Sequence, residues 1–307
     1  MKPMLSANAI RSVALVGIAA VTVVAQQSVP QWQIAASGTA KFDVASVRQE
    51  APGSNVRMRA NVETSGNGNF VPTGGLYSVI ANLHMFVTFA YKLNPYGWYS
   101  VASQLPKWAN EVNFDIEARA PGNPTKDQYR LMVQALLADR FKLAAHWEPK
   151  QMPVLAIVLE KPGKLGPDIR PHSDDVPCPA ALALYGDNAA GQKTISGGFP
   201  ERCGLSNWFD SGLWHIAGRN VSIADITDYL YLGPGDTPVI DKTGLKGKYD
   251  FTLKWSPEPA DLIDAQPDAN GPTMAEALNN QLGFKVVKAK DSVETLVIDH
   301  VEMPSAN

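Results

Sequence analysis

The stretch PVIDKTGLKGKYDFTLKW, residues 238–255, carries the signals around which the predicted fold is built. Its middle, residues 242–247, holds two glycines and is typical of a turn. From Lys248 to Trp255 apolar and polar side chains then alternate, which predicts a half-buried β-strand. A short helical pattern precedes this stretch and another follows it, so we expect a small unit of strands and helices here.

The first half of the chain predicts the same order of elements with different residues. In both halves the order is strand, helix, strand, helix, strand, strand, and short sequence matches occur at equivalent places. We therefore expect residues 68–160 to superpose on residues 213–303. The matching segments are Phe114-Asp115-Ile116 with Tyr249-Asp250-Phe251, Met132…Leu136 with Met274…Leu278, and Phe141-Lys142-Leu143 with Phe284-Lys285-Val286.

Each unit is predicted to be an α+β layer, in which two helices cover one face of a small, mainly antiparallel sheet. Apolar side chains three or four residues apart predict a single helix over residues 76–93, which Asn94-Pro95 ends. Capping-box signals at Thr125 and Thr273 start a later helix in each unit. Each unit then closes with two strands, at residues 141–147 and 153–159 in the first and at residues 284–287 and 293–301 in the second.

The N-terminus has the features of a signal peptide. Lys2 and Arg11 supply positive charge, residues 13–24 are mostly apolar, and small or β-branched residues precede the expected cleavage after position 25. A retained membrane anchor is the alternative, but the apolar run is shorter than the ~20 residues that a span needs. We expect a secreted or periplasmic protein with no stable membrane span after cleavage.

The two cysteines, Cys178 and Cys203, are expected to form a disulfide, because disulfides persist in the compartments to which exported chains are sent. They flank a segment rich in Gly and Pro, and closing such a loop stabilises a protein by roughly 3 kcal/mol. A zinc site is the alternative, but two Cys without a nearby His lack the usual ligand spacing. We expect no metal ion and no cofactor.

These signals divide the 307 residues into five parts. An irregular segment of this length is uncommon inside a compact domain, so residues 161–210 are interpreted as a boundary between units. The expected parts are a signal peptide (1–25), a disordered leader (26–40), a first α+β unit (41–160), a disulfide-containing linker or insertion (161–210) and a second α+β unit (211–304).

The segment Asp241-Lys242-Thr243-Gly244 matches the start of the phosphoaspartate motif of P-type ATPases, which transfer a phosphoryl group. Leu245 replaces the Thr expected next, and no Gly-rich phosphate loop accompanies the motif. A turn, with the side chains of Asp241 and Thr243 bonded to local backbone, is therefore the favoured interpretation.

Catalytic histidines and carboxylates are not marked by any motif. No His has the spacing of a metal-binding HExxH motif, and the chain lacks a GxSxG nucleophile elbow. Asp115 and Asp250 occupy matching positions of the repeat, which favours a structural role for both. The histidines are His84, His146, His172, His215 and His300, and the carboxylates that could pair as acid and base are Asp115, Glu117, Asp250, Asp299 and Glu302.

An aromatic-rich connection after residue 90 is the best candidate for a binding surface. Aromatic rings with a polar group suit contact with a small ligand, a glycan or a protein. A lid over the first sheet is the alternative. The candidate binding residues are Tyr96, Trp98, Tyr99 and Trp108, with Tyr91 close by. We expect them near the seam between the two units, because clefts between domains are favoured ligand sites.

Eight motifs and one histidine spread over residues 42–304 carry a family resemblance. They are FDVASVR (42–48), LPKW (105–108), FDIEA (114–118), LLADRFKL (136–143) with His146, VIDKTGL (239–245), GKYDF (247–251), QLG (281–283) and VID (297–299). In these motifs the chain resembles a soil-associated family of uncharacterised secreted bacterial proteins, a domain of unknown function. Related domains are fused to membrane metallopeptidase sensors of the β-lactam-response type, which implies sensing or interaction. The element order of the second unit also resembles the short N-terminal domain of secretins and TonB-dependent receptors.

The sequence thus favours an exported, non-catalytic protein that binds a protein, glycan or small-molecule ligand in the cell envelope. A secreted hydrolase that uses a carboxylate or histidine is one alternative, and a structural envelope component is another. A formal net charge of −3 gives no electrostatic reason to expect nucleic acid as a partner.

Overall fold

The computed structural model describes most of the two predicted units. The predicted signal peptide and Cys178 lie outside the described residues, so its cleavage and the Cys178–Cys203 disulfide stay predictions. Cys203 itself is not a free thiol. The described residues are 29–36, 41–51, 59–62, 73–173, 175, 198–201, 203–230, 237–257 and 271–304.

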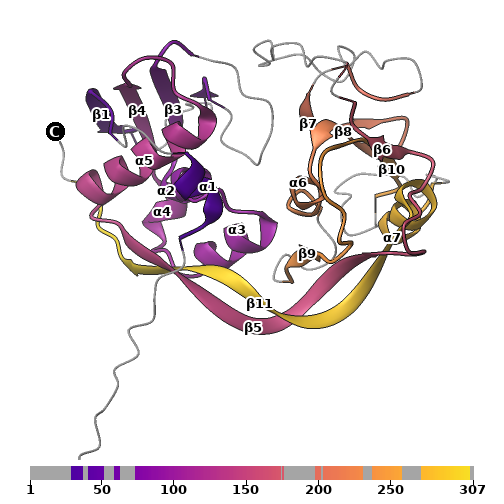
Figure 1. The fold of residues 1–307 in the computed structure, drawn as a ribbon. Helices are drawn as coiled ribbons and strands as arrows, with labels where there is room; N and C mark the ends of the chain where they lie inside the picture. Colours follow the sequence, from indigo (N-terminus) through magenta and orange to yellow (C-terminus); the bar gives the residue numbers. More distant parts are fainter. Residues whose placement is uncertain are drawn as a thin grey trace, which may run out of the picture.

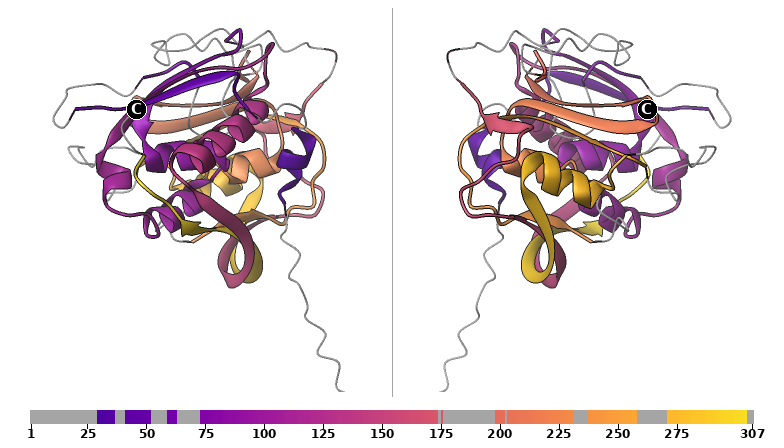
Figure 2. Two further views of the ribbon diagram at one scale, coloured as in Figure 1. Left: turned by 90° about the vertical axis from the view of Figure 1, so that its left-hand side faces the viewer. Right: turned by 90° about the vertical axis from the view of Figure 1, so that its right-hand side faces the viewer.

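The molecule consists of two lobes that stand side by side on one long two-stranded ladder (Figure 1). Each lobe has its own four-stranded antiparallel sheet. Helices lie between these sheets and the ladder in all views (Figure 1, Figure 2). The predicted α+β fold class is confirmed.

The first lobe has a sheet of order β1-β4-β3-β2. Helices α2 and α5 pack on it, and their apolar side chains join those of the sheet in one core. Its strands are β1 (Val44–Gln49), β2 (Arg59–Ala60), β3 (Leu76–Asn82) and β4 (Asn113–Arg119). Its helices are α1 (Gln31–Ala35), α2 (Leu83–Ala90), α3 (Pro95–Ala102), α4 (Trp108–Glu111) and α5 (Lys126–Arg140).

The second lobe has a sheet of order β6-β10-β8-β7 and a second core. Its strands are β6 (Ile169–Pro171), β7 (Gly204–Asp210), β8 (Leu213–Val221) and β10 (Tyr249–Trp255). Its helices are α6 (Ile223–Thr227), α7 (Met274–Ala277) and the π-helix η3 (Leu278–Leu282). No helix in the described part of the chain is long and apolar enough to cross a membrane.

The two sheets have the same topology. In each, the chain forms one edge strand, then the opposite edge strand, then the inner strand beside it, and finally the remaining inner strand. An ion pair repeats at the same register, since Arg48 lies opposite Asp115 at 3.3 Å and Arg170 lies opposite Asp250 at 3.5 Å. This agreement supports the predicted duplication and the structural interpretation of the two aspartates.

The ladder consists of β5 (Ala144–Leu159) and β11 (Phe284–His300), paired antiparallel along their length. The prediction of two short strands in each place is wrong. The middle of each strand is polar because it crosses from one lobe to the other, and its exposed side chains imitate a turn. A short strand, β9 (Val239–Asp241), adds to β5 in parallel beneath the second lobe.

The ladder interlocks the lobes. Leu296, near the end of the chain, is buried in the first core, and Ile157, from the end of the first unit, is buried in the second. Pro149 and Pro153 do not interrupt the pairing of β5 with β11. The N–H of Leu155 points away from β11 and donates to Pro238 O. Pro149 and Pro153 have the same orientation along β5 as Leu155. The N–H group that each proline lacks would therefore point to the edge of β5 that is not paired to β11.

Three further expectations need correction. The helix expected over residues 76–93 is in fact β3 followed by α2. Both faces of β3 are largely buried, so its apolar residues follow one another with a spacing that also fits a helix. Asn82 caps α2, because its side-chain oxygen accepts a hydrogen bond from Met85 N. The expected disordered leader, 26–40, contains α1. The expected linker, 161–210, supplies the edge strands β6 and β7. β6 has only three residues, and the segment is rich in Gly and Pro, so its pattern did not indicate strands.

The interlocked ladder makes a stability prediction. Leu296→Ala should lower the free energy of unfolding by about 2–5 kcal/mol, because Leu296 is 2% exposed and its removal leaves a cavity in the first core. Val44→Ala, at a position 61% exposed in the same lobe, should cost less than about 0.5 kcal/mol. Urea unfolding followed by tryptophan fluorescence measures both, and equal costs would show that β11 does not complete the first core.

Candidate functional site

A cavity of about 480 Å³ lies where the two lobes and the ladder meet. Its walls come from α1, from the connection between α2 and α3, from α6, and from facing parts of β5 and β11. In Figure 1, α1 and α3 lie in the left lobe, α6 lies in the right lobe, and β5 and β11 run beneath both. We call it the interlobe pocket. It lies at the seam where the sequence predicted a binding surface.

Aromatic side chains form the apolar part of the interlobe pocket. Trp32, Tyr91, Tyr96 and Trp147 all line it. The rings of Tyr91 and Trp147 meet edge to face, with centroids 6.4 Å apart. The hydroxyl of Tyr96 lies 3.3 Å from Thr295 Oγ1 on β11, which ties the first lobe to the ladder. Burial raises the pKa of Tyr91 to about 12, so this phenol stays neutral at physiological pH.

Asn94 joins the two lobes across the interlobe pocket. It precedes Pro95, and its side-chain oxygen caps α3 by accepting from Gly97 N at 2.9 Å. Its Nδ2 then faces Asp228 Oδ1 in the second lobe at 3.5 Å. One amide therefore uses its oxygen for the helix cap and directs its nitrogen to the other lobe.

The two aspartates near α6 differ in environment. Asp225 belongs to the capping box of α6, accepts from Ser222 N and Oγ, and lies 3.4 Å from Lys248 Nζ. Burial alone would raise the pKa of Asp225, but these hydrogen bonds and the Lys248 charge together lower it. Asp228 lies just after the helix, and among the described residues its carboxylate has only the Asn94 amide as a hydrogen-bond partner.

The carboxyl group of Asp228 is the most perturbed acid of the interlobe pocket. Surrounding protein raises its pKa from 3.8 to about 6, and the nearby Asp225 charge adds to this, while Asn94 and Lys92 oppose it. Asp228 is nevertheless an exposed residue of the pocket wall, so the surrounding protein encloses it only in part. Perturbed acids in clefts are candidates for function.

The four predicted binding residues have different positions. Tyr96 lines the interlobe pocket, and the other three do not. Trp98 packs against His84, with ring centroids 4.5 Å apart, and Tyr99 meets the Trp98 ring edge to face. Trp108 packs on Phe114 of the first core, which corresponds to the alternative of a lid.

Other pocket residues were missed by sequence reasoning. Trp32 lies in the segment predicted to be disordered, although a tryptophan in a polar leader was itself a signal. Trp147 and Glu294 lie in the ladder, whose continuity was not predicted. Asp228 carried no sequence signal, because only the fold brings it to Asn94.

Three histidines form pairs with carboxylates outside the interlobe pocket, and one of them is His300, whose Nε2 lies 2.8 Å from Glu302 Oε1. His172 Nδ1 lies 2.7 Å from buried Asp250, and His146 Nδ1 lies 2.8 Å from Asp299. Within the described part of the chain, neither ring is hydrogen-bonded to Ser, Thr or Cys. Asp250 also accepts from Asn220 N and pairs with Arg170, so its bonding capacity serves the second sheet.

The segment that imitates the P-type ATPase motif forms a turn. Asp241 Oδ1 accepts from Thr243 N at 2.8 Å and from Thr243 Oγ1 at 2.7 Å, and Gly244 has a φ of +72°. These bonds match the turn interpretation.

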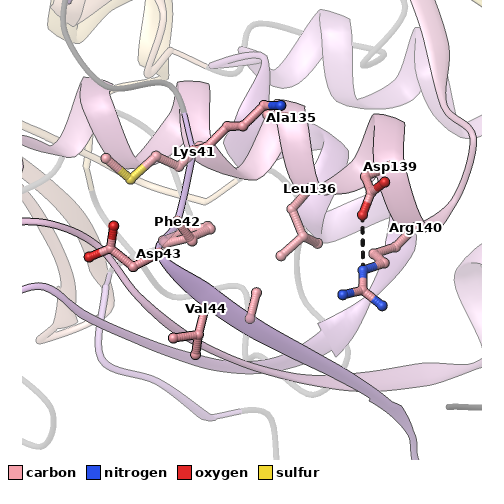
Figure 3. A pocket seen from close by; sticks show the side chains of 10 residues that line it. Lys41, Phe42, Asp43, Val44, Ala135, Leu136, Asp139 and Arg140 are labelled. Atoms are coloured by element: carbon pink, nitrogen blue, oxygen red, sulfur yellow. Dashed lines mark ion pairs between the residues drawn. The ribbon is translucent and has the colours of Figure 1, made fainter.

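A second cavity, of about 490 Å³, lies between β1 and α5 (Figure 3). Phe42, Val44 and Leu136 form its apolar surface, and Asp139 pairs with Arg140 at its rim at 3.1 Å. Its walls belong to the first lobe alone, so it does not use the junction of the two units. Among the described residues, no group of three or more His, Cys, Asp or Glu is placed to hold a metal ion.

Comparison with known proteins gives one match. Residues 84–301 match a family described as "protein of unknown function (DUF3738)". The matched region runs from α2 through β11, so it spans parts of both lobes and most walls of the interlobe pocket, while Trp32 lies outside it. No curated protein and no solved structure matches the chain.

The raised pKa of Asp228 predicts a pH-dependent stability. The folded state holds this proton more tightly than the unfolded state, so the free energy of unfolding should fall as pH rises from about 4 to about 6 and then level off. Asp228→Asn should therefore stabilise the protein relative to wild type at pH 8, with a gain that shrinks toward pH 4. Thermal unfolding across this range measures the effect.

Asp210→Asn, at an exposed position of β7, is the matched control and should not change the profile. A pH profile of Asp228→Asn that runs parallel to wild type would contradict the raised pKa.

Proposed function

We propose, from the premise that this chain belongs to the DUF3738 family of proteins of unknown function, that it is an exported, non-catalytic protein that binds a small ligand in the interlobe pocket. The observation that carries the proposal is the origin of the pocket walls. They come from the first lobe, the second lobe and the ladder together. Clefts between packed units are favoured ligand sites, because several elements can place side chains around one molecule.

The chemistry of the walls supports binding. Aromatic rings supply apolar contact area, and Asn94 and Asp228 supply polar groups that orient a ligand. A volume of about 480 Å³ lies within the range of small-molecule sites. Because the ligand would contact both lobes at once, its binding would also strengthen their association.

Export is part of the proposal. It rests on the signal-peptide pattern of residues 1–25 and on the resemblance to a soil-associated family of secreted bacterial proteins. The weaker likeness of the second unit to the short N-terminal domain of secretins and TonB-dependent receptors is compatible with a role in the cell envelope. We place the protein in the periplasm or outside the cell.

A bulky residue inside the pocket tests ligand binding. Ala224 lines the interlobe pocket at α6 and is exposed, so Ala224→Trp should fill the space without disturbing either core. We expect this variant to lose the rise in melting temperature that a ligand from a metabolite library gives wild type. Asn207→Trp, an exposed position on β7, is the control and should respond like wild type. Equal responses of both variants would place the ligand elsewhere.

Export predicts a defined mature chain. Protein recovered from the cell envelope should begin after residue 25, and mass analysis without reduction should show Cys178 bonded to Cys203. An intact N-terminus, or two free thiols, would contradict this part of the proposal.

A further inference from the structure

The interlobe pocket contains a carboxylate, that of Asp228, with no cation at ion-pair distance among the described residues. Lys92 Nζ lies 4.0 Å from Asp127 Oδ2, and Lys248 Nζ lies 3.4 Å from Asp225 Oδ2. The carboxylate of Asp228 has no ion pair within 4 Å among the described residues, and the one hydrogen bond that it accepts, from Asn94 Nδ2, is long at 3.5 Å. Three carboxylates lie in the walls, those of Asp225, Asp228 and Glu294. Among the described lining residues, Lys92 carries the only ammonium group. Their balance is negative.

The aromatic side chains of the walls, among them Trp32 and Trp147, line the cavity with their rings. Trp147 lines the pocket, but its Nε1 is buried and has no hydrogen-bond partner in the described structure. What Trp147 presents to the cavity is therefore carbon. The indole of Trp32 already attracts cations, since Lys92 Nζ lies 5.8 Å and Arg130 Cζ 5.9 Å from its ring centroid. Cations bind over such rings because the ring face carries negative charge.

We propose that the interlobe pocket binds an organic cation, a protonated or quaternary amine, whose charged group lies between the Asp228 carboxylate and the aromatic rings. This inference rests on the proposed ligand-binding function. An anionic ligand would meet three carboxylates. A neutral apolar ligand would cover Asp228 without compensating its charge, which is costly.

The ionisation of Asp228 makes this binding depend on pH. A bound cation favours the charged carboxylate, so affinity rises with pH up to about 6 and is constant above it. Other titratable or charged groups line the same pocket. Asp225 has a lowered pKa, Tyr91 titrates near 12, and the ammonium of Lys92 and the carboxylate of Glu294 are the remaining charged groups around Asp228.

Quaternary ammonium probes test the inference, because their charge does not change with pH. The probes are tetramethylammonium, choline and benzyltrimethylammonium, and the neutral control is 3,3-dimethylbutan-1-ol, the carbon isostere of choline. Titration calorimetry at pH 8 should show at least one cation binding wild type roughly tenfold more tightly than the neutral alcohol. Lowering the pH to 5 should weaken that cation roughly tenfold, as the ionised fraction of Asp228 falls.

Two variants identify the site. Asp228→Asn keeps the shape of the side chain and should remove both the preference for the cation and the pH dependence, whereas Asp210→Asn should retain both. Ala224→Trp should block every probe.

Binding of the neutral alcohol as tightly as the cations, with both blocked by Ala224→Trp, would overturn the cation inference and leave the proposed function intact. Cation binding that Ala224→Trp does not affect would overturn the inference and count against the pocket itself. No binding of any of the three cations would overturn the inference alone, since a metabolite-library ligand blocked by Ala224→Trp would still support the proposed function.

Discussion

The pairing of β5 with β11 is the constraint on which the rest of the molecule depends. Each strand has apolar side chains at both ends and polar side chains in the middle, so each end completes a different core. Neither lobe can bury its helices fully without the strand that the other half of the chain supplies. The seam between the lobes is therefore fixed by main-chain hydrogen bonds beneath it, and the side chains around the interlobe pocket are held in place by both cores.

The two lobes share a topology but not a surface. The Arg–Asp pair repeats at the same register in each sheet, which keeps the edge strand aligned. The segments that face the seam have diverged: the first lobe contributes a connection with aromatic rings, and the second contributes the end of a short helix with Asp228. Two lobes of the same sheet topology thus form a pocket with one apolar side and one acidic side.

Much of the fold could be predicted from local signals, and the pocket only in part. Capping boxes at Thr125, Ser222 and Thr273 mark true helix starts, and alternation marks β4 and β10 correctly. Residues 76–82 were misread because a strand buried on both faces has no polar alternation. The polar middle of β5 imitated a turn, since the sequence does not show that it spans two lobes. Tyr96 was found through its aromatic neighbours, whereas Asp228 and Trp32 reach the site only through long-range packing.

The crossing of β11 into the first core has a kinetic consequence. Tyr96 and its partner Thr295 are 199 residues apart in the chain, and Leu296 completes a core whose other members precede residue 144, with Ala145 and Trp147 packed against it. As the chain emerges from a ribosome or a translocation channel, the first lobe lacks its last strand until β11, Phe284–His300, has passed. Contacts of such separation form slowly, so the first lobe is completed only after β11 has been synthesised or transported. A chain whose first lobe is completed this late remains threadable through a narrow channel, which fits the export that we propose.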